Sequence, residues 1–257
     1  MTTKVALVTG AARGIGLATV KRFLADGYAV ALLDIDADNL ARTVTALGDD
    51  KRVLALPHDI GNAREIEAAM KTFRARFDRL DVLVNNAGIA VFKPALETSH
   101  EEFQRSLDVN LTGPFLLTKA CVPLMREGAA IVNITSISGL RASALRVAYG
   151  TTKAALSHLT KQFALELSVR GIRVNAVAPG PVDTAMAKAV HSAAIRADYH
   201  DAIPLGRYGL EAELAEAVFF LCSERASYIN GHTLPVDGGF DAIGIGLPTY
   251  RKDMGVA

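Results

Sequence analysis

The sequence predicts a doubly wound α/β domain in which helices cover both faces of a parallel sheet. Strand-like and helix-like segments alternate from the first residues onward, as is typical of such sheets. The strand-like segments are continuous apolar runs, which is expected of strands buried on both faces. Half of the 257 residues are hydrophobic, enough to bury a large core. No linker rich in Pro, Gly or Ser divides the chain, so residues 1–257 are expected to form a single domain.

Each element is predicted from its own pattern. Short apolar runs predict strands, at residues 5–9, 29–33, 53–56, 82–85, 130–134, 173–178 and 233–236. Stretches with apolar residues at helical spacing predict helices, at residues 15–25, 37–47, 63–77, 149–169 and 212–222, with one long helical stretch at about 101–125.

Two segments do not fit the alternation. Residues 182–210 form a long irregular insertion after a strand, which is a candidate lid over a substrate. This segment carries His191, Arg196, Tyr199, His200, Asp201 and Arg207. Residues 240–257 follow the last predicted strand. A mobile terminus is the default expectation, but this one is apolar enough to be docked.

The charge balance excludes several classes of partner. Lys plus Arg total 28 and Asp plus Glu total 27, and the absence of a basic block argues against nucleic acid. No apolar run is long enough to span a bilayer, and no export signal is recognisable, so we expect a cytoplasmic protein without a membrane partner.

Cys121 and Cys222 are expected to be two buried thiols. No residue is assigned to a metal site.

A glycine-rich turn joins the first predicted strand to the first helix. Gly10 can adopt the positive φ of a sharp turn, while Gly14 and Gly16 lack Cβ atoms. Backbone amides there could approach a pyrophosphate at the helix amino terminus. The alternative is a tight turn without a ligand. The longer dinucleotide spacing is not matched, because Thr19 stands where its third glycine would be.

Two acids follow later strands. Asp34 ends the second strand, where a carboxylate can accept the hydroxyl protons of an adenosine ribose and repel a 2′-phosphate. Asp59 follows the third strand and could bind an adenine amino group. Both could instead cap helices, and Asp36 could replace Asp34 in that role. Arg13 in the turn would favour a 2′-phosphate, but the position of Asp34 favours NAD over NADP.

Tyr149 and Lys153 are the most informative pair in the chain. One helical turn separates them, so both side chains project from the same helix face. A fixed ammonium favours a phenolate, which predicts a lowered pKa for Tyr149 and a proton-transfer role near neutral pH. Ser136 follows a predicted strand and would lie at the carboxyl edge of the sheet, where ligands bind in open α/β folds. Thr135 and Ser138 are rivals for the same hydroxyl role.

The sequence resembles the short-chain dehydrogenase/reductase family. The motifs that carry the resemblance run in order from the first strand to the last, as TGAARGIG (9–16), NNAG (85–88), VNLTG around Asn110, NITS ending at Ser136, YGTTK (149–153), PGPVDT (179–184) and VDGG (236–239). The resemblance implies a three-layer Rossmann fold with a seven-stranded parallel sheet. It also implies a nicotinamide dinucleotide cofactor and a homotetramer.

The resemblance implies roles for individual residues. The catalytic positions are Asn110, Ser136, Tyr149 and Lys153, with Tyr149 as acid/base and Asn110 holding a relay water. Asn85 would tie the fourth strand to its neighbours. The cofactor-binding set comprises Gly10, Arg13, Gly14, Ile15, Gly16, Asp34, Asp59, Ile60, Asn86, Ala87, Gly88, Tyr149, Lys153, Pro179, Gly180, Val182 and Thr184.

The sequence says least about the substrate, expected to be a small alcohol or ketone. Ser138, Arg141 and Arg146 lie in the loop that borders the substrate in the family, and two arginines suit a polyhydroxy or anionic molecule. Surface charge is the alternative. A sugar or polyol dehydrogenase is the first expectation, ahead of a 3-oxoacyl (acyl-carrier-protein) reductase and a hydroxysteroid or secondary-alcohol dehydrogenase. A non-catalytic nucleotide-sensing regulator remains an alternative of another class.

Overall fold

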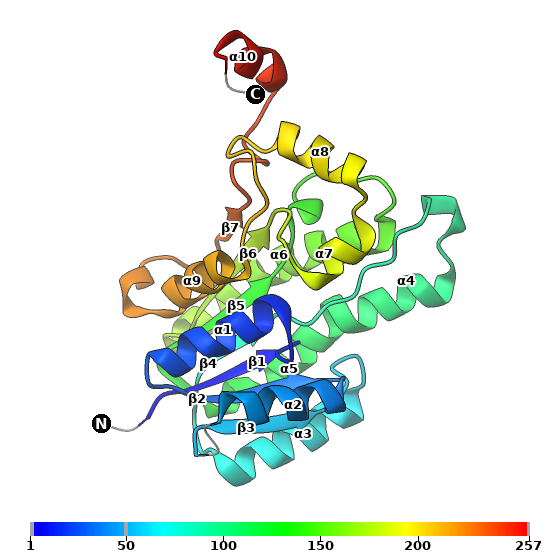
Figure 1. Cartoon of the computed structure of the whole chain (residues 1–257). Coiled ribbons are helices and arrows are strands. Elements are labelled where there is room, and N and C mark those ends of the chain that lie inside the picture. The colour runs from blue at the N-terminus through cyan, green and yellow to red at the C-terminus, as the bar shows by residue number, and fades with distance from the viewer. Residues whose placement is uncertain (1–2, 49–50, 256–257) are drawn as a thin grey trace.

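Seven parallel strands form one twisted sheet at the centre of the computed structural model, which describes residues 3–48 and 51–255 (Figure 1). The strand order is β3-β2-β1-β4-β5-β6-β7. The strands are β1 Val5–Thr9, β2 Ala29–Asp34, β3 Val53–Pro57, β4 Leu80–Asn85, β5 Met125–Ile134, β6 Arg173–Pro179 and β7 Thr233–Val236. This order confirms the predicted doubly wound, three-layer Rossmann fold.

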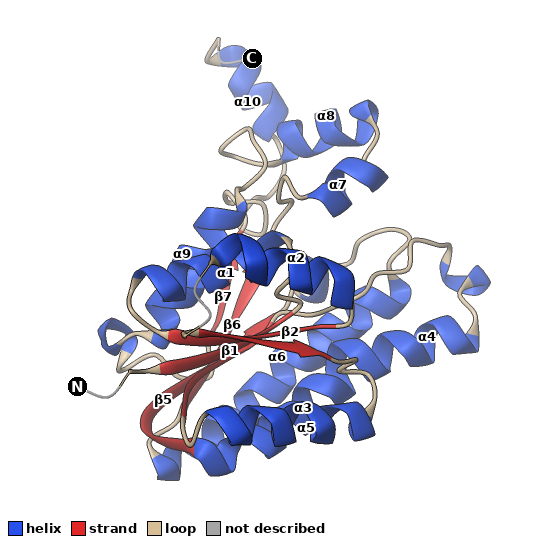
Figure 2. Cartoon of the chain, turned by 60° about the horizontal axis from the view of Figure 1, so that its bottom comes forward, coloured by secondary structure: helices blue, strands red, loops and turns tan. Residues whose placement is uncertain are grey.

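Helices cover both faces of the sheet (Figure 2). Side chains of α1, α2 and α9 enter the core on one face, and those of α3, α5 and α6 enter it on the other. The helices are α1 Gly14–Ala25, α2 Ala37–Leu47, α3 Ala63–Arg76, α4 His100–Leu107, α5 Gly113–Cys121, α6 Val147–Leu167, α7 Ala185–Val190, α8 Ala193–Ala202, α9 Glu211–Cys222 and α10 Leu247–Asp253. In the part of the chain described here, no helix is long and apolar enough to cross a membrane, and no three potential metal ligands cluster.

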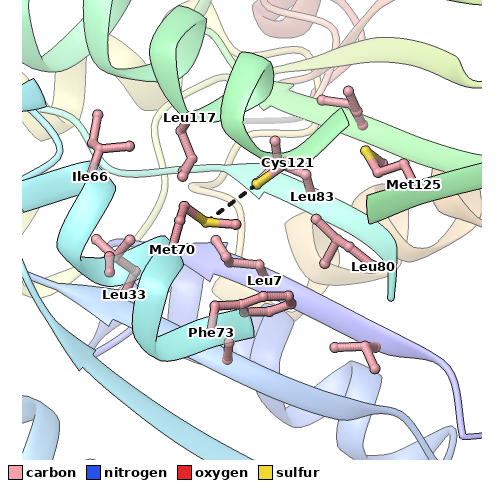
Figure 3. Close-up of a cluster of buried hydrophobic side chains, with 14 of the residues drawn as sticks. Leu7, Leu33, Ile66, Met70, Phe73, Leu80, Leu83, Leu117, Cys121 and Met125 are labelled. Atoms are coloured by element: carbon pink, nitrogen blue, oxygen red, sulfur yellow. Dashed lines mark hydrogen bonds between the residues drawn. The ribbon is translucent and has the colours of Figure 1, made fainter. Parts of the chain in front are cut away.

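Apolar side chains form a buried cluster between the sheet and helices α3 and α5 (Figure 3). Phe73 and Met70 of α3 are fully buried against Leu83 of β4. Cys121 lies 3.8 Å from the sulfur of Met70. Burial raises the pKa of both Cys121 and Cys222 to about 12, and both are free. The prediction of two buried thiols is therefore confirmed.

The strand order reverses between β1 and β4. The chain winds outward from β1 to β3 and then returns to place β4 on the other side of β1. Ligands of doubly wound sheets bind at the carboxyl ends of the strands beside such a reversal. The glycine turn after β1 and the NNAG segment after β4 therefore meet at this edge.

The long helix predicted at about 101–125 is interrupted. It consists of α4, a π turn at Asp108–Thr112 and α5, and Met125 already belongs to β5. The amide of Gly113 donates to the carbonyl of Asp108, five residues back. Pro114 has no N–H, so it cannot donate a hydrogen bond to the backbone carbonyl of Val109 or of Asn110. The missing donor at Pro114 and the five-residue hydrogen bond before it explain why the α-helix is interrupted here.

The predicted lid is more regular than expected. Residues 182–210 were expected to be irregular, but they form α7 and α8. A short parallel bridge between Val182 and Gly209 closes the base of the segment, with Asp183 N donating to Gly209 O at 2.9 Å. Hydroxyl caps explain the helices locally, since Thr184 accepts from Ala187 N and Ser192 from Ile195 N. Figure 1 shows this segment beyond the carboxyl edge of the sheet.

Arg251 in the tail makes several hydrogen bonds to the lid. Arg251 of α10 donates to the carbonyls of His200, Asp201 and Pro204 at 2.9–3.0 Å, and to that of Ile203. These carbonyls lie in and just beyond the last turn of α8, where helix carbonyls lack partners and favour a cation. The docked tail was anticipated as one of two outcomes, but α10 itself was not predicted.

We expect Arg251→Ala to release α10 without unfolding the domain. Because the contacts lie at the surface, the loss in global free energy of unfolding should stay below about 1 kcal/mol. Hydrogen exchange should accelerate in α10 and the last turn of α8, while Lys252→Ala on the same helix should leave both unchanged. Unaltered exchange in the Arg251 variant would contradict the docking.

Candidate active site

Tyr149 and Lys153 lie together on the first turns of α6, at the carboxyl edge of the sheet. The ammonium of Lys153 is 5.8 Å from the ring centre of Tyr149. Lys153 Nζ also donates to the carbonyl of Ile134, the last residue of β5, at 2.7 Å. That bond fixes the buried ammonium beside the strand end. The geometry is the one predicted from the four-residue spacing.

Ser136 is the hydroxyl that faces Tyr149. Its hydrogen bond is one of the influences that favour the phenolate of Tyr149. The two rivals are engaged elsewhere, because Thr135 Oγ1 donates to Val177 O at 3.0 Å and Ser138 Oγ pairs with Ser143 Oγ at 3.2 Å. The backbone amide of Ser138 donates to Ser136 Oγ at 3.1 Å, which orients the hydroxyl.

The predicted pKa shift of Tyr149 is wrong in sign. Burial raises the pKa of the Tyr149 phenol, while the hydrogen bond from Ser136 and the charge of Arg146 oppose this increase without overcoming it. Burial also lowers the pKa of Lys153 to about 8. Desolvation disfavours the charged form of both groups. The sequence prediction counted the attraction between them but could not count burial.

Asn110 sits in the π turn and is fully buried. Its side chain accepts from Ile89 N and donates to Ile89 O, both at 2.9 Å, and donates to Thr152 Oγ1 at 3.0 Å. These bonds tie the loop after β4 to α6. A Cβ at Gly88 would lie 3.1 Å from Asn110 Oδ1 and 3.3 Å from Lys153 Nζ. Glycine therefore permits this close approach.

The glycine turn is joined to the NNAG segment by hydrogen bonds. Thr9 Oγ1 accepts from the amides of Asn86 and Ala87 at 2.9 Å, and Asn86 Nδ2 donates to Thr9 O at 2.8 Å. Gly10 has φ of +61°, and a Cβ there would lie 2.9 Å from Ala87 Cα. A Cβ at Gly16 would collide with the carbonyl of Gly10. Glycine is required at these two positions by the turn itself, and the turn leads into α1 with a free amino-terminal edge suited to a pyrophosphate.

The fourth strand is tied to its neighbours as the resemblance implied. Asn85 Nδ2 donates to Asn133 Oδ1 on β5 at 2.8 Å and to Thr118 Oγ1 on α5 at 3.3 Å. Asn133 in turn donates to Thr160 on α6 at 2.9 Å. This buried polar chain fixes the strand ends that carry the NNAG segment and Ser136.

Asp34 is buried at the end of β2 and does not cap a helix. Its carboxylate accepts from Ala12 N at 2.9 Å and Asp36 N at 3.0 Å. The cap of α2 is Asp36, which accepts from Asn39 N. Arg13 is exposed and pairs with Asp36 at 3.6 Å. The capping alternative is therefore excluded for Asp34, and the turn places its carboxylate against the backbone next to Arg13.

Asp59 also does not cap the following helix, because Asn62 caps α3. Its carboxylate accepts from Gly61 N at 2.8 Å and from Arg105 Nη2 at 2.7 Å. Ile60 beside it is buried in the core. Asp59 is thus held at the sheet edge by a cation from α4, a partner that the sequence did not reveal.

The remaining cofactor candidates lie where β6 ends. A Cβ at Gly180 would lie 2.6 Å from the Cβ of Asp237, so glycine lets the PGPVDT segment pack on the VDGG segment. Pro179 is the last residue of β6, and Val182 is buried at the base of the lid. The hydroxyl of Thr184 caps α7. These residues border the same edge as Ser136.

The two loop arginines have different surroundings. Arg146 Nη1 donates to Ser138 Oγ at 3.2 Å, and its Nη2 lies 3.3 Å from Tyr199 Oη and 3.5 Å from His191 Nε2. Arg141 instead donates to the carbonyl of Phe240 and covers its ring. The structure therefore brings Arg146 and Ser138 together and turns Arg141 toward the tail.

A cluster of aromatic rings around Arg146 was not anticipated as a unit. His191, Tyr199 and Tyr208 of the lid pack against one another with ring centres 5.2–5.9 Å apart. Phe92 lies under Arg146, and Phe240 of the tail packs on Tyr199. The only signal in the sequence was the concentration of His, Tyr and Arg in residues 191–208.

Comparison with known proteins identifies the family. A family model described as enoyl-(acyl carrier protein) reductase matches residues 10–241. The 3-oxoacyl-[acyl-carrier-protein] reductase of Synechocystis sp. is 40% identical over 244 residues, covering 93% of this chain and 97% of that protein. The 2-(R)-hydroxypropyl-CoM dehydrogenase of Xanthobacter autotrophicus is 41% identical over 249 residues, covering 93% and 99%. The uncharacterized short-chain type dehydrogenase/reductase y4vI of Sinorhizobium fredii is 41% identical, and the chain spans 44% of its length.

Solved structures agree. A short-chain dehydrogenase/reductase from Brucella melitensis, described as glucose/ribitol dehydrogenase, superposes with a TM-score of 0.89 at 33% identity, covering 92% of this chain and 96% of that one. A 3-ketoacyl-(acyl-carrier-protein) reductase from the same organism, solved with NADH, gives 0.86 at 35% identity, covering 93% and 98%. A blue fluorescent protein from a metagenomic library, solved with NADPH, gives 0.85 at 35% identity, covering 92% and 97%.

The chain belongs to the short-chain dehydrogenase/reductase family of nicotinamide-nucleotide oxidoreductases, which act on alcohol and carbonyl groups. The relatives differ in the substrates that their names give. Of the neighbouring structures, one was solved with NADH and another with NADPH.

Proposed function

We propose that this protein is an NAD-dependent oxidoreductase that interconverts a secondary alcohol and a ketone, with a sugar, polyol or other small polar alcohol as substrate. The observation that carries the proposal is the meeting of Ser136, Tyr149 and Lys153 at the sheet edge beside the glycine turn. A nicotinamide bound at that edge would supply the hydride acceptor or donor. The chain itself would supply position and proton transfer.

Each catalytic residue has a separate task. In oxidation, Tyr149 as phenolate takes the alcohol proton, and in reduction the phenol returns it to the oxygen. Ser136 donates a hydrogen bond to the same oxygen, which stabilises negative charge on it. Lys153 places a positive charge beside the phenol and would hold the nicotinamide ribose. The side-chain groups of Asn110 are all occupied, so its backbone carbonyl would hold the relay water.

The test is absorbance at the nicotinamide band with NAD and with NADP, over a panel of polyols, sugars, hydroxy acids and simple secondary alcohols. Turnover with at least one secondary alcohol is expected. Tight NAD binding without turnover on the whole panel would instead favour a nucleotide-sensing regulator. All four catalytic positions are occupied in this chain, which argues against that alternative.

The preference for NAD is proposed from Asp34. Its carboxylate stands at the end of β2 with two backbone amides as partners, and no cation among the described residues pairs with it, so a 2′-phosphate would meet an uncompensated negative charge. We expect Asp34→Asn to lower the ratio of kcat/KM for NAD over NADP by roughly tenfold or more, since like-charge repulsion is removed.

Asp38→Asn is the matched control, because it removes an exposed carboxylate from the first turn of α2 and leaves the contacts of Asp34 and the pair of Asp36 with Arg13 in place. Steady-state kinetics with both cofactors would measure the ratio. A parent enzyme that already prefers NADP would show that Asp34 does not set the choice.

A 3-oxoacyl (acyl-carrier-protein) reductase is the second candidate, favoured by relatives that carry that name. Efficient reduction of a 3-oxoacyl thioester, preferred over every free alcohol or ketone, would select it.

We also infer a cytoplasmic homotetramer. Leu165 and Val169, exposed on and just after α6, are 72% and 87% accessible, and such apolar residues suit a contact with a second copy.

A further inference from the structure

A guanidinium without a carboxylate partner lies beside the proposed reactive phenol. Arg146 precedes Tyr149 by three residues, and its charge acts on the phenol. Its hydrogen-bond partners are neutral, namely Ser138, Tyr199 and His191, at distances of 3.2–3.5 Å. Among the residues that the structure describes, no carboxylate lies within ion-pair distance of Arg146. These long, neutral contacts leave the guanidinium able to exchange them for a stronger acceptor.

The surroundings of Arg146 carry an excess of positive charge. Arg196 covers the ring of Tyr208 at 4.3 Å, and Tyr208 Oη lies 3.0 Å from His191 Nδ1. Asp183, which lies beside Arg196, is already paired with Arg196 and with Lys188. The Nη1 group of Arg196 is buried without a partner in the part of the chain described. Burial and the two arginines lower the pKa of His191, which favours the neutral imidazole.

The position of Arg146 relates this charge to the reaction. Ser138, which accepts from Arg146, is two residues after Ser136, and its amide donates to Ser136 Oγ. An anionic group bound at Arg146 would therefore lie close to a substrate oxygen that is held between Ser136 and Tyr149, so both could belong to one small molecule. Planar guanidinium groups bind small oxyanions in a bidentate manner.

We propose that the substrate is a secondary alcohol, or the matching ketone, that carries a small oxyanion such as a carboxylate bound by Arg146. This inference rests on the proposed oxidoreductase function and narrows its substrate class. Arg196 adds positive charge behind the site, and the hydroxyl of Tyr199 is the group that the oxyanion displaces from Arg146. The lid supplies Tyr199 and Arg196, so anion binding and lid position are coupled.

The kinetic test compares substrates that differ only in charge. 3-Hydroxybutyrate is paired with 3-hydroxybutyramide, and the corresponding hydroxysulfonate and hydroxyalkyl phosphate distinguish the kinds of oxyanion. The parent should prefer an anion, and Arg146→Gln should lose roughly 10–100-fold in kcat/KM for it, because a charge-assisted hydrogen bond is removed. The loss for the amide should be smaller than about threefold, and Arg146→Lys should restore part of the activity.

The matched control is Arg207→Gln, which removes a guanidinium from the lid segment that supplies Tyr199 and Arg196. Arg207 is already engaged by Glu213 at 2.6 Å, so both substrates should react as in the parent. Equal losses for acid and amide in Arg146→Gln would overturn the proposal, since they would assign Arg146 to the chemistry of Tyr149 alone.

A second readout does not depend on turnover. Acetate or methanesulfonate should raise the pKa of His191, followed by its imidazole NMR signals, because the anion neutralises the arginines beside it. This response should vanish in Arg146→Gln. Turnover of neutral alcohols without any anion preference or His191 response would sink the anion site and leave the proposed function intact. Failure with every alcohol and ketone, charged or neutral, would sink the proposed function itself.

Discussion

Tyr149→Phe is expected to lower turnover by roughly 10²–10⁴-fold, the usual contribution of a positioned acid/base. Phenylalanine keeps the ring on α6 but removes the group that exchanges the proton with the substrate oxygen. Cofactor affinity should change little, because the ribose contact would come from Lys153. Steady-state kinetics and cofactor titration by fluorescence measure the two quantities separately.

The pH dependence of the parent enzyme follows from the same group. Burial holds the pKa of Tyr149 above its usual value, with Ser136 and Arg146 opposing. Oxidation needs the phenolate, so its rate should increase with pH, whereas reduction needs the phenol and should not. Tyr228→Phe, at a fully exposed tyrosine, is the control. Turnover of Tyr149→Phe within tenfold of the parent would reject the assignment.

Features set by local sequence could be predicted closely. The last strand was predicted at the residues it occupies, and the shared face of Tyr149 and Lys153 followed from helical geometry alone. Such features depend on neighbours along the chain.

Features set by distant contacts could not be predicted. Arg146 meets His191 and Tyr199 across 45 and 53 positions, and no local pattern encodes that meeting. The break at Pro114 was hidden because apolar spacing continues on both sides of the π turn. The direction of the pKa shift of Tyr149 depends on burial, which exists only in the folded chain.

Lys153→Met should give a protein that is less active and, near neutral pH, more stable. Loss of the positive charge beside the phenol should lower turnover by roughly 10²-fold. Burial lowers the pKa of Lys153 from 10.5 to about 8, which corresponds to a destabilisation of about 3 kcal/mol at neutral pH. The hydrogen bond to Ile134 O offsets about 1 kcal/mol of this, so methionine should raise the free energy of unfolding by about 2 kcal/mol.

The pH dependence of this difference identifies its cause. The folded-state pKa of Lys153 lies below the unfolded value, so the unfolded chain binds more protons between about pH 8 and pH 10.5, and the parent gains stability as pH rises through that window. The advantage of Lys153→Met should therefore be full below about pH 8 and disappear before about pH 10.5, where only the lost hydrogen bond to Ile134 O remains. Cys121 and Cys222 titrate in both proteins and cancel in the comparison. Urea unfolding across this range, with Lys161→Met on the exposed side of α6 as control, provides the measurement. A variant less stable than the parent at neutral pH would mean that interactions in the folded protein offset the cost of burying the Lys153 ammonium. Lys153 would then not destabilise the protein.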